Sequence, residues 1–308
     1  MPNSSPSQPT IAVVIPCYQE AVTIGKVIAD FRHELPAARI YVYDNNCTDR
    51  TAEIAAQAGA VVRREKRQGK GYVVAAMFEQ IQEDILVMVD GDDTYEAAHV
   101  HQLLAPVLRG DADMTVATRL TSHGEKSFRP LHVAGNQMVC GIINWMFQSQ
   151  VSDIFSGYRV FSRESARQIP VTTRGFDVET ELTLQALYRG QVIKELPSPY
   201  RARPEGSFSK LNTFSDGFRV LLRLFLIVKS YKPLTFFGSL SLVLFALGLA
   251  AGIMPVYEFV TVHYVYRVPS AILAASLMML AFFSLGLGLI LNSMNLRLLE
   301  LEQLISKR

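Results

Sequence analysis

Two carboxylates separated by a single glycine, Asp90 and Asp92, follow directly after the apolar run Ile85–Val89. A short apolar run that ends so abruptly is typical of a buried parallel strand, and open α/β sheets bind ligands at the carboxyl ends of such strands. Two like charges held this close repel each other, and a divalent cation relieves the repulsion. We therefore expect a Mg²⁺ or Mn²⁺ ion that also contacts a diphosphate. The alternative is an acidic turn that leads into a helix, with Asp93 as its N-cap, and for Asp93 itself the cap is the preferred interpretation.

Three further strand-like runs also end in segments that could do chemistry. The first is followed by residues 16–20, the second by residues 44–49 and the third by the glycine–lysine–glycine segment 69–71. Because the carboxyl ends of parallel strands meet at one edge of a sheet, these segments should line a single crevice. Carboxylates, a lysine and glycines that permit close approach suit a nucleotide diphosphate and its metal. Taken singly, each segment is ambiguous, since Asp49 could cap the helix that begins at Thr51 and residues 69–71 could form an ordinary turn.

The elements that must position these residues alternate between strand-like and helical patterns. The expected strands are Ile11–Ile15, Ile40–Tyr43, Ala60–Val62, Ile85–Val89, Met114–Ala117 and Val192–Leu196. The expected helices are Ala21–Leu35, Thr51–Ala58, Tyr72–Ile81, Ala97–Leu108, Leu131–Phe147 and Val178–Tyr188. This order predicts an α/β domain with a mostly parallel, Rossmann-like sheet and helices on both faces. The polar segments 119–130 and 197–212 are expected to be loops.

Two long stretches near the C-terminus lack Asp, Glu, Lys and Arg: Pro233–Tyr257, with 25 residues, and Val268–Leu296, with 29. As a helix the shorter stretch would extend about 37 Å, enough to cross a hydrocarbon core of about 30 Å. We expect transmembrane helices at about 234–256 and 269–291. The alternative, a pair of buried core helices, is disfavoured because core helices of this length normally carry a polar stripe.

Basic residues flank the two expected spans on one side of the membrane. They are Arg219, Arg223, Lys229, Lys232, Arg297, Lys307 and Arg308, whereas the connecting loop carries one basic residue, Arg267. The positive-inside rule then places both termini and the catalytic domain in the cytoplasm of a multi-pass membrane protein. The expected parts are a disordered tail (1–10), the catalytic domain (11–212), an amphipathic interfacial helix (213–232), the two spans with a short outside loop (233–292) and a cytoplasmic C-terminal helix (293–308).

Composition excludes several classes of protein. The three cysteines have no CxxC spacing and support neither a disulfide framework nor a zinc site. The net charge of +2, without a basic-aromatic module, gives no sign of nucleic-acid binding. The N-terminal residues lack the apolar segment of a signal peptide.

The motifs VVIPCYQE, DNNCTDRT, GKG and VDGDDTY, in this order, resemble those of the family-2 glycosyltransferases, which have the GT-A fold. The further segments SDIFSGYRVFSR (152–163), FDVETEL (176–182) and RPEGSFSK (203–210), followed by two spans, narrow the resemblance. The whole resembles polyprenyl-phosphate glycosyltransferases, namely the dolichol-phosphate mannose synthase group and its bacterial undecaprenyl-phosphate relatives. The resemblance covers residues 11–295.

The resemblance implies a role for each matching residue. The nucleotide sugar would be bound by Pro16, Tyr18, Glu20, Asp44, Lys70, Asp90 and Arg119. The acceptor phosphate would be bound by Arg129, Arg203, Ser209 and Lys210. The divalent cation, Mg²⁺ or Mn²⁺, would be held by Asp92 and by the residue at position 94. The catalytic set would be Asp90, Asp92, Arg129 and Lys210.

Two positions depart from the pattern of the family. Many members have a second acidic residue where this chain has Asn45, which leaves the contacts to the base open. The second metal ligand, often Gln, falls at Thr94, whose hydroxyl is a poorer ligand, so that water could complete the coordination.

The reaction implied by the resemblance is transfer of a sugar from a UDP- or GDP-sugar to undecaprenyl or dolichyl phosphate at the cytoplasmic face, with inversion, for glycan or cell-envelope assembly. The acceptor phosphate is ionised near neutral pH, so a general base is optional. The candidates for such a base are Asp153, Asp177, Glu179 and Glu181, although Glu179 and Glu181 also suit the start of a helix. The alternatives are transfer to another membrane lipid and a non-catalytic subunit that binds nucleotide sugar. The sequence leaves the oligomeric state open, and a homo-oligomer is one alternative.

Overall fold

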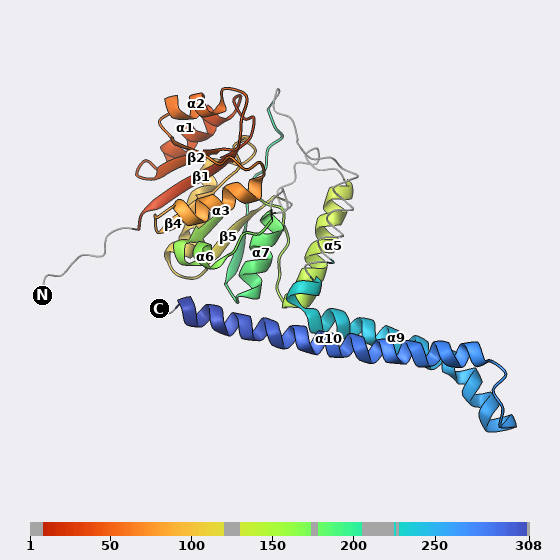
Figure 1. The fold of residues 1–308 in the computed structure, drawn as a ribbon. Coiled ribbons are helices and arrows are strands. Elements are labelled where there is room, and N and C mark those ends of the chain that lie inside the picture. The colour runs from red at the N-terminus through yellow and green to blue at the C-terminus, as the bar shows by residue number, and fades with distance from the viewer. Residues whose placement is uncertain (1–8, 120–129, 174–177, 205–224, 226–227, 307–308) are drawn as a thin grey trace, which may run out of the picture. The chain divides into compact units, whose positions relative to one another are not determined.

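The computed structural model describes residues 9–119, 130–173, 178–204, 225 and 228–306 (Figure 1). The chain divides into two compact units, Met1–Asn212 and Thr213–Arg308. Most of the expected N-terminal tail, and the expected interfacial helix except for residues 225 and 228–232, lie outside the described residues.

The first unit is built on a seven-stranded sheet with the order β3-β2-β1-β4-β6-β5-β7. The strands are β1 (Ile11–Cys17), β2 (Arg39–Asp44), β3 (Val61–Arg64), β4 (Ile85–Met88), β5 (Met114–Thr118), β6 (Arg159–Ser162) and β7 (Ile193–Pro197). Strand β6 runs antiparallel to its neighbours β4 and β5, whereas the other neighbouring strands are parallel. The prediction of an α/β fold with a mostly parallel sheet is therefore confirmed.

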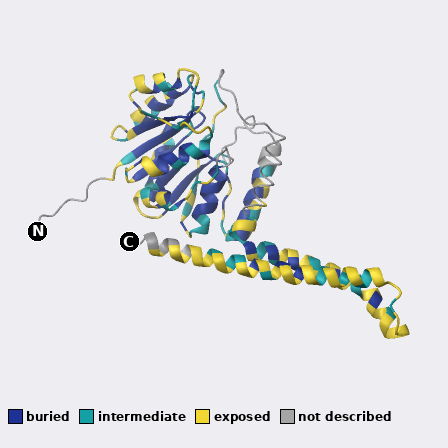
Figure 2. Cartoon of the chain, viewed as in Figure 1, coloured by how far each residue is buried: buried dark blue, intermediate teal, exposed yellow. Residues whose placement is uncertain are grey.

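Helices cover both faces of the sheet because successive side chains of a strand point to opposite faces. The helices are α1 (Ile24–Glu34), α2 (Thr51–Gln57), α3 (Lys70–Gln80), η1 (Ala97–His99), α4 (Val100–Leu108), α5 (Pro130–Phe147), α6 (Arg163–Gln168) and α7 (Val178–Tyr188). In β1, Val13 and Ile15 belong to a core shared with α1 and α4, and Ala12 and Val14 to a second core shared with α3, α6 and α7. Figure 2 shows these two buried layers along the strands and the inner sides of the helices.

The register of the sheet brings the ends of β1, β2 and β4 to one edge. Cys17, the last residue of β1, pairs with Asp44, the last residue of β2. On its other side β1 pairs with β4 up to Val14 and Met88, and Asp90 follows two residues later. The predicted sites at the carboxyl ends of these strands therefore share one edge of the sheet.

Strand β6 and helix α6 were not among the elements expected from the sequence. The strand is short and begins at Arg159, whose side chain is fully buried. A charged residue at this position hides the apolar pattern by which a buried strand is usually recognised. Pairing with β4 and β5 on both sides supplies the backbone hydrogen bonds that hold the segment extended.

Most of the described part of the second unit consists of two long apolar helices, α9 (Pro233–Val262) and α10 (Val268–Ser306), that pack along each other. Hydroxyl groups on each helix donate to backbone carbonyls of the other, at 2.7 Å from Ser241 to Ala281 and 2.8 Å from Ser284 to Phe237. Both helices are long and apolar enough to cross a membrane, and most of their side chains are exposed rather than packed in a protein core. The helix α10 continues without a break into residues 293–306.

The aromatic contact between Phe31 and Tyr158 gives a test of the core beneath the site. Phe31 is 1% exposed and its ring meets that of Tyr158 edge to face at 5.9 Å. Replacing Phe31 by alanine should lower the free energy of unfolding by about 3–5 kcal/mol through loss of burial and a residual cavity. The melting temperature of the purified protein in detergent measures this effect. The control is Val22→Ala, at a side chain that is 64% exposed, which should leave the melting temperature nearly unchanged.

Candidate active site

The centre of the site is the ammonium group of Lys70, the first residue of α3. Its Nζ lies 2.5 Å from Oδ1 of Asp90 and also contacts a carboxylate oxygen of Glu179 on α7. Burial lowers the pKa of Lys70, but the two carboxylates outweigh this effect, so that the pKa is raised and the ammonium stays charged. Burial raises the pKa of Asp90, and the charge of Lys70 outweighs it in the opposite direction, so that this pKa is lowered. The cluster joins three elements that are distant in the sequence.

The backbone of Gly157 lies close to the carboxylate of Asp90. A Cβ atom at Gly157 would lie 2.2 Å from Oδ2 of Asp90, so a larger residue could not occupy this position without displacing the carboxylate. The hydroxyl of Tyr95 accepts a hydrogen bond of 3.0 Å from the N–H of Gly157 and lies 3.2 Å from the hydroxyl of Ser156. The segment that contacts Asp90 is thereby held by a buried tyrosine.

Asp92 is buried and each of its carboxylate oxygens has a partner. Oδ1 accepts a hydrogen bond of 2.6 Å from the hydroxyl of Thr94, and Oδ2 lies 2.6 Å from Nη2 of Arg203. Burial and the nearby charge of Asp90 raise the pKa of Asp92, although Arg203 and Thr94 oppose them. The structure thus brings both predicted metal ligands into contact with each other, and it brings a predicted phosphate-binding arginine to the same carboxylate.

Residues 200–203 lie along residues 94–96. Tyr95 and Tyr200 form an isolated antiparallel bridge, and their rings are 5.2 Å apart. The N–H of Arg201 donates to the carbonyl of Thr94 at 2.9 Å, and its guanidinium pairs with the carboxylate of Glu96. This pairing positions Arg203, two residues further along the chain, next to Asp92.

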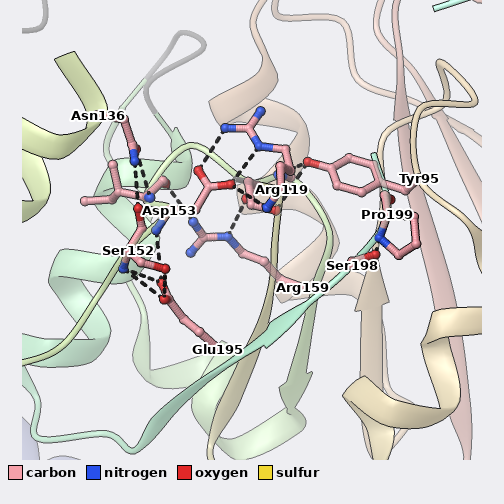
Figure 3. A network of polar contacts seen from close by, with 12 residues as sticks. Tyr95, Arg119, Asn136, Ser152, Asp153, Arg159, Glu195, Ser198 and Pro199 are labelled. Carbon is pink, nitrogen blue, oxygen red and sulfur yellow. Dashed lines mark hydrogen bonds and ion pairs between the residues drawn. The ribbon is translucent and has the colours of Figure 1, made fainter. Parts of the chain in front are cut away.

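Arg119 is anchored by a buried carboxylate (Figure 3). Nε and Nη2 of Arg119 donate to the two oxygens of Asp153 at 2.8 and 2.9 Å, and the backbone N–H of Arg119 donates to Oδ2 at 3.0 Å. The guanidinium also lies over the ring of Tyr200, 5.4 Å from its centroid. Asp153 is fully buried, and its two oxygens serve to hold this arginine.

A second network holds the segment that carries Asp153, and sequence reasoning missed its members, Asn136, Arg159 and Glu195 (Figure 3). Arg159 is fully buried and donates to the carbonyls of Ser156 and Ile154 at 2.8 and 2.9 Å. Glu195 and Asn136 bind the backbone of the same segment from other elements. The one signal in the sequence was a charged residue inside the apolar run that became β6.

The residues predicted to bind base and ribose lie at the ends of β1 and β2. Asp44 and Glu20 are buried, and Tyr18 is 37% exposed. Oδ1 of Asp44 accepts a hydrogen bond of 2.8 Å from the N–H of Cys47, which turns the chain away from the strand. Pro16, next to the end of β1, completes this side of the site.

Asn45 stands where many family members have an acidic residue, and its amide has a structural role of its own. It holds the loop that leads to Lys70. Its Nδ2 donates to the carbonyls of Glu65 and Arg67 at 3.1 and 2.8 Å, and its Oδ1 accepts from the N–H of Gly69 at 2.8 Å. A carboxylate has no hydrogen to donate and could not make the first two bonds. The departure from the family pattern therefore has a local structural reason.

The expectation that Asp93 caps a helix is wrong. Its backbone has a positive φ of 57° and its side chain pairs with Lys26 at 2.8 Å, whereas the helical turn η1 begins later, with Glu96 as its cap residue. Asp93 lies three residues before this cap position, and its carboxylate is engaged by Lys26 instead.

The expectation that Glu179 and Glu181 stand at a helix start is confirmed, since both lie in the first turn of α7. Each also has a partner, Lys70 for Glu179 and the N–H groups of Thr172 and Thr173 for Glu181. Four further predicted positions, namely Asp177, Arg129, Ser209 and Lys210, lie outside the described residues.

Comparison with known proteins identifies the class to which this fold and site belong. A family model described as Glycosyl transferase family 2 matches residues 12–169, about half of the chain. Glycosyltransferase AglJ of Haloferax volcanii is 34% identical over 83% of this chain and 84% of its own length. A dolichyl-phosphate hexose transferase of the same organism is 30% identical over 67% of this chain and 89% of its own length. The chain belongs to glycosyltransferase family 2 and is a glycosyltransferase.

Solved structures show the same fold at lower sequence identity. Glucosyl-3-phosphoglycerate synthase from Mycobacterium tuberculosis, in complex with UDP, superposes with a TM-score of 0.58 at 22% identity, over 71% of this chain and 80% of its own. The complex of that enzyme with Mn²⁺, UDP and glucosyl-3-phosphoglycerate has a TM-score of 0.56 at 23% identity, over 72% of this chain and 80% of its own. The first unit therefore has the GT-A fold.

Because Gly157 lies so close to Asp90, adding a single methyl group at position 157 should strongly lower the activity. We expect Gly157→Ala to displace the carboxylate of Asp90 and to lower kcat/KM for the donor by about 100-fold, the usual result of a misplacement of about 1 Å. Steady-state kinetics with the natural donor measures this change. The control is Gly141→Ala in α5, where a Cβ meets no atom within 4 Å and activity should be retained. Full activity of Gly157→Ala would contradict the assigned contact.

The thiol of Cys47, close to Asp44, predicts a pH-dependent reactivity. Burial raises the pKa of Cys47 to about 11 and that of Cys140 likewise to about 11. Because the thiolate is the reactive form, both thiols should be alkylated at pH 8 at least about tenfold more slowly in the native protein than in the unfolded chain. The native rates should rise steeply between pH 9 and about pH 11. Mass spectrometry after timed exposure to iodoacetamide measures both rates, and rapid labelling of native Cys47 at pH 8 would disprove the prediction.

Proposed function

We propose that this enzyme transfers a sugar from a nucleotide-diphosphate donor to polyprenyl phosphate at the cytoplasmic face of a membrane. The observation that carries the proposal is that the charged site at the sheet edge and two helices able to cross a membrane occur in one chain. An enzyme anchored in the bilayer suits an acceptor whose hydrocarbon tail stays there. The relative named dolichyl-phosphate hexose transferase supports this acceptor, and a fold relative crystallised with Mn²⁺ and UDP-glucose supports this donor class.

We assign the two sides of the site to the two parts of the donor. Base and ribose are bound by the ends of β1 and β2, through Pro16, Tyr18, Glu20 and Asp44. The diphosphate and sugar lie toward the charged centre, which comprises Lys70, Asp90 and Arg119. The ammonium and guanidinium groups there bind phosphate oxygens, and the carboxylate of Asp90 accepts hydrogen bonds from sugar hydroxyls.

The residues around Asp92 fit a divalent cation. Two of the three carboxylates at the centre, Asp90 and Glu179, share the ammonium of Lys70, whereas Asp92 draws its positive charge from Arg203. The guanidinium of Arg203, 2.6 Å from Oδ2 of Asp92, shows that the surroundings of this carboxylate stabilise a positive charge. Within the described residues no cluster of three or more His, Cys, Asp or Glu side chains could hold a metal. An ion held by Asp92, with the hydroxyl of Thr94 or water, would neutralise charge on the leaving diphosphate.

The chain itself aligns the reactants and stabilises the departing charge. An oxygen of the acceptor phosphate forms a bond to the anomeric carbon while the bond from that carbon to the diphosphate oxygen breaks, so the configuration inverts. The acceptor is already ionised, and no proton has to be removed from it. The arrangement agrees with this, because Asp153 binds Arg119 and Glu179 binds Lys70.

The acceptor phosphate is assigned to Arg203 together with Arg129, Ser209 and Lys210. Their guanidinium, hydroxyl and ammonium groups are the partners that phosphate oxygens prefer. Basic residues before α9 and after α10 support a cytoplasmic position for the catalytic domain, residues 11–212, and for both termini. Lipid phosphate would then meet the donor at the membrane surface.

A matched pair of aspartate variants tests the proposed function. We expect Asp92→Asn to lower the transfer of radiolabelled sugar to polyprenyl phosphate by about 100-fold or more, because it removes the charge that holds the cation. Chelation with EDTA should abolish transfer by the unaltered enzyme. The neighbouring variant Asp93→Asn breaks the ion pair with Lys26 and should keep activity within about threefold.

The assay uses membranes that express each variant, a panel of UDP- and GDP-sugars, and mass spectrometry of the lipid product. Label in another lipid would replace polyprenyl phosphate as the acceptor. Failure to label any lipid with any of these donors would refute the proposal.

A further inference from the structure

The ion pair between Arg203 and Asp92 has a consequence for the order in which ligands bind. Oδ2 of Asp92 lies 2.6 Å from Nη2 of Arg203, and Oδ1 is bonded to the hydroxyl of Thr94. The side chain of Asp92 is 5% exposed and that of Arg203 is 30% exposed. One carboxylate oxygen, facing the site, is therefore held by a guanidinium that solvent can still reach.

We infer that Arg203 competes with the divalent cation for Asp92, and that loading of the cation with the donor releases this arginine to the acceptor phosphate. The inference rests on the proposed function, because it takes Asp92 as the ligand of the cation and Arg203 as a ligand of the lipid phosphate. A divalent cation of this kind binds a carboxylate oxygen at about 2.0–2.1 Å. A guanidinium nitrogen in direct contact with the same oxygen cannot stay there, for reasons of space and of like charge.

The backbone around Arg203 allows the side chain to move while the chain stays in place. Tyr200 is bridged to Tyr95, and Arg201 is bonded through its N–H to Thr94 and through its side chain to Glu96. These contacts hold residues 200 and 201 independently of the Asp92 pair. Exchange of partners therefore needs rotation of one long side chain, and the released guanidinium stays next to the metal and the diphosphate.

The exchange predicts an ordered reaction. Before the cation binds, the guanidinium of Arg203 is neutralised by Asp92 and attracts a phosphate weakly. After the cation takes Asp92, that carboxylate no longer balances the charge of Arg203, which then attracts the acceptor phosphate more strongly. Lipid phosphate, which is always present in the membrane, would then bind productively after the donor and its metal.

Binding of Mn²⁺ without any nucleotide tests the competition directly. The full-length protein in detergent is titrated with Mn²⁺ at pH 8, where protonation of carboxylates does not interfere, and free Mn²⁺ is measured by electron paramagnetic resonance. We expect Arg203→Gln to bind Mn²⁺ about fivefold more tightly than the unaltered protein, since it removes a competing ion pair. Arg203→Lys, which keeps the charge, should stay within about twofold. The control Arg50→Gln removes an exposed pair with Glu53 at the start of α2 and should change nothing.

Addition of UDP or GDP should reduce the advantage of Arg203→Gln to less than about twofold, because the negative charge of the neighbouring diphosphate stabilises the released guanidinium without taking the place of the acceptor phosphate. Equal or weaker binding of Mn²⁺ by Arg203→Gln without nucleotide would overturn the inference, as would a fivefold gain in Arg203→Lys. This outcome is separate from the fate of the proposed function. A protein that transfers sugar normally but shows no gain refutes the competition alone, and one that labels no lipid refutes the proposed acceptor whatever its affinity for Mn²⁺.

Discussion

The site depends on the pairing of the Lys70 ammonium with the carboxylates of Asp90 and Glu179. Burying a charge is costly unless an opposite charge accompanies it, and here one buried ammonium group pairs with two carboxylates, one just after β4 and one in α7. Because Lys70 pairs with Asp90 and Glu179, the third carboxylate, Asp92, pairs with a different cation, Arg203. This distribution of charge brings both ammonium and guanidinium groups and three carboxylates together at the edge of the sheet.

The support for this cluster comes in part from Arg159, which acts on it through the segment 153–157. Arg159, fully buried at the start of β6, donates to carbonyls of residues 154 and 156 and so fixes the segment from Asp153 to Gly157. At one end of that segment Asp153 binds Arg119, and at the other end Gly157 lies close to the carboxylate of Asp90. The antiparallel strand β6, inserted between β4 and β5, thus determines where two predicted donor-binding residues lie, Asp90 directly and Arg119 through its carboxylate partner.

Much of the first unit could be predicted because its strands and helices carry regular apolar patterns. The runs that became β1, β2 and β4 are short, apolar and followed by polar residues, which is the signature of parallel strands that end at a binding edge. The pattern failed at β6, where a buried arginine hid the strand, and at Asp93, where a residue type favoured in caps is instead used for an ion pair with Lys26. Asn45 was noticed as a departure from the family, but its bonds to the loop before Lys70 depend on a loop path that no local pattern describes.

By itself the sequence determined the class of fold, the edge of the sheet at which the predicted site residues gather, the family, and the two apolar helices able to cross a membrane. Each of these follows from local periodicity or from motifs a few residues long. Tertiary structure decided the partners: Glu179 for Lys70, Asp153 for Arg119, Gly157 for Asp90 and Arg203 for Asp92. These pairs join residues from 34 to more than 100 positions apart, and which charges meet is set by sheet order and helix packing rather than by any neighbour in the chain.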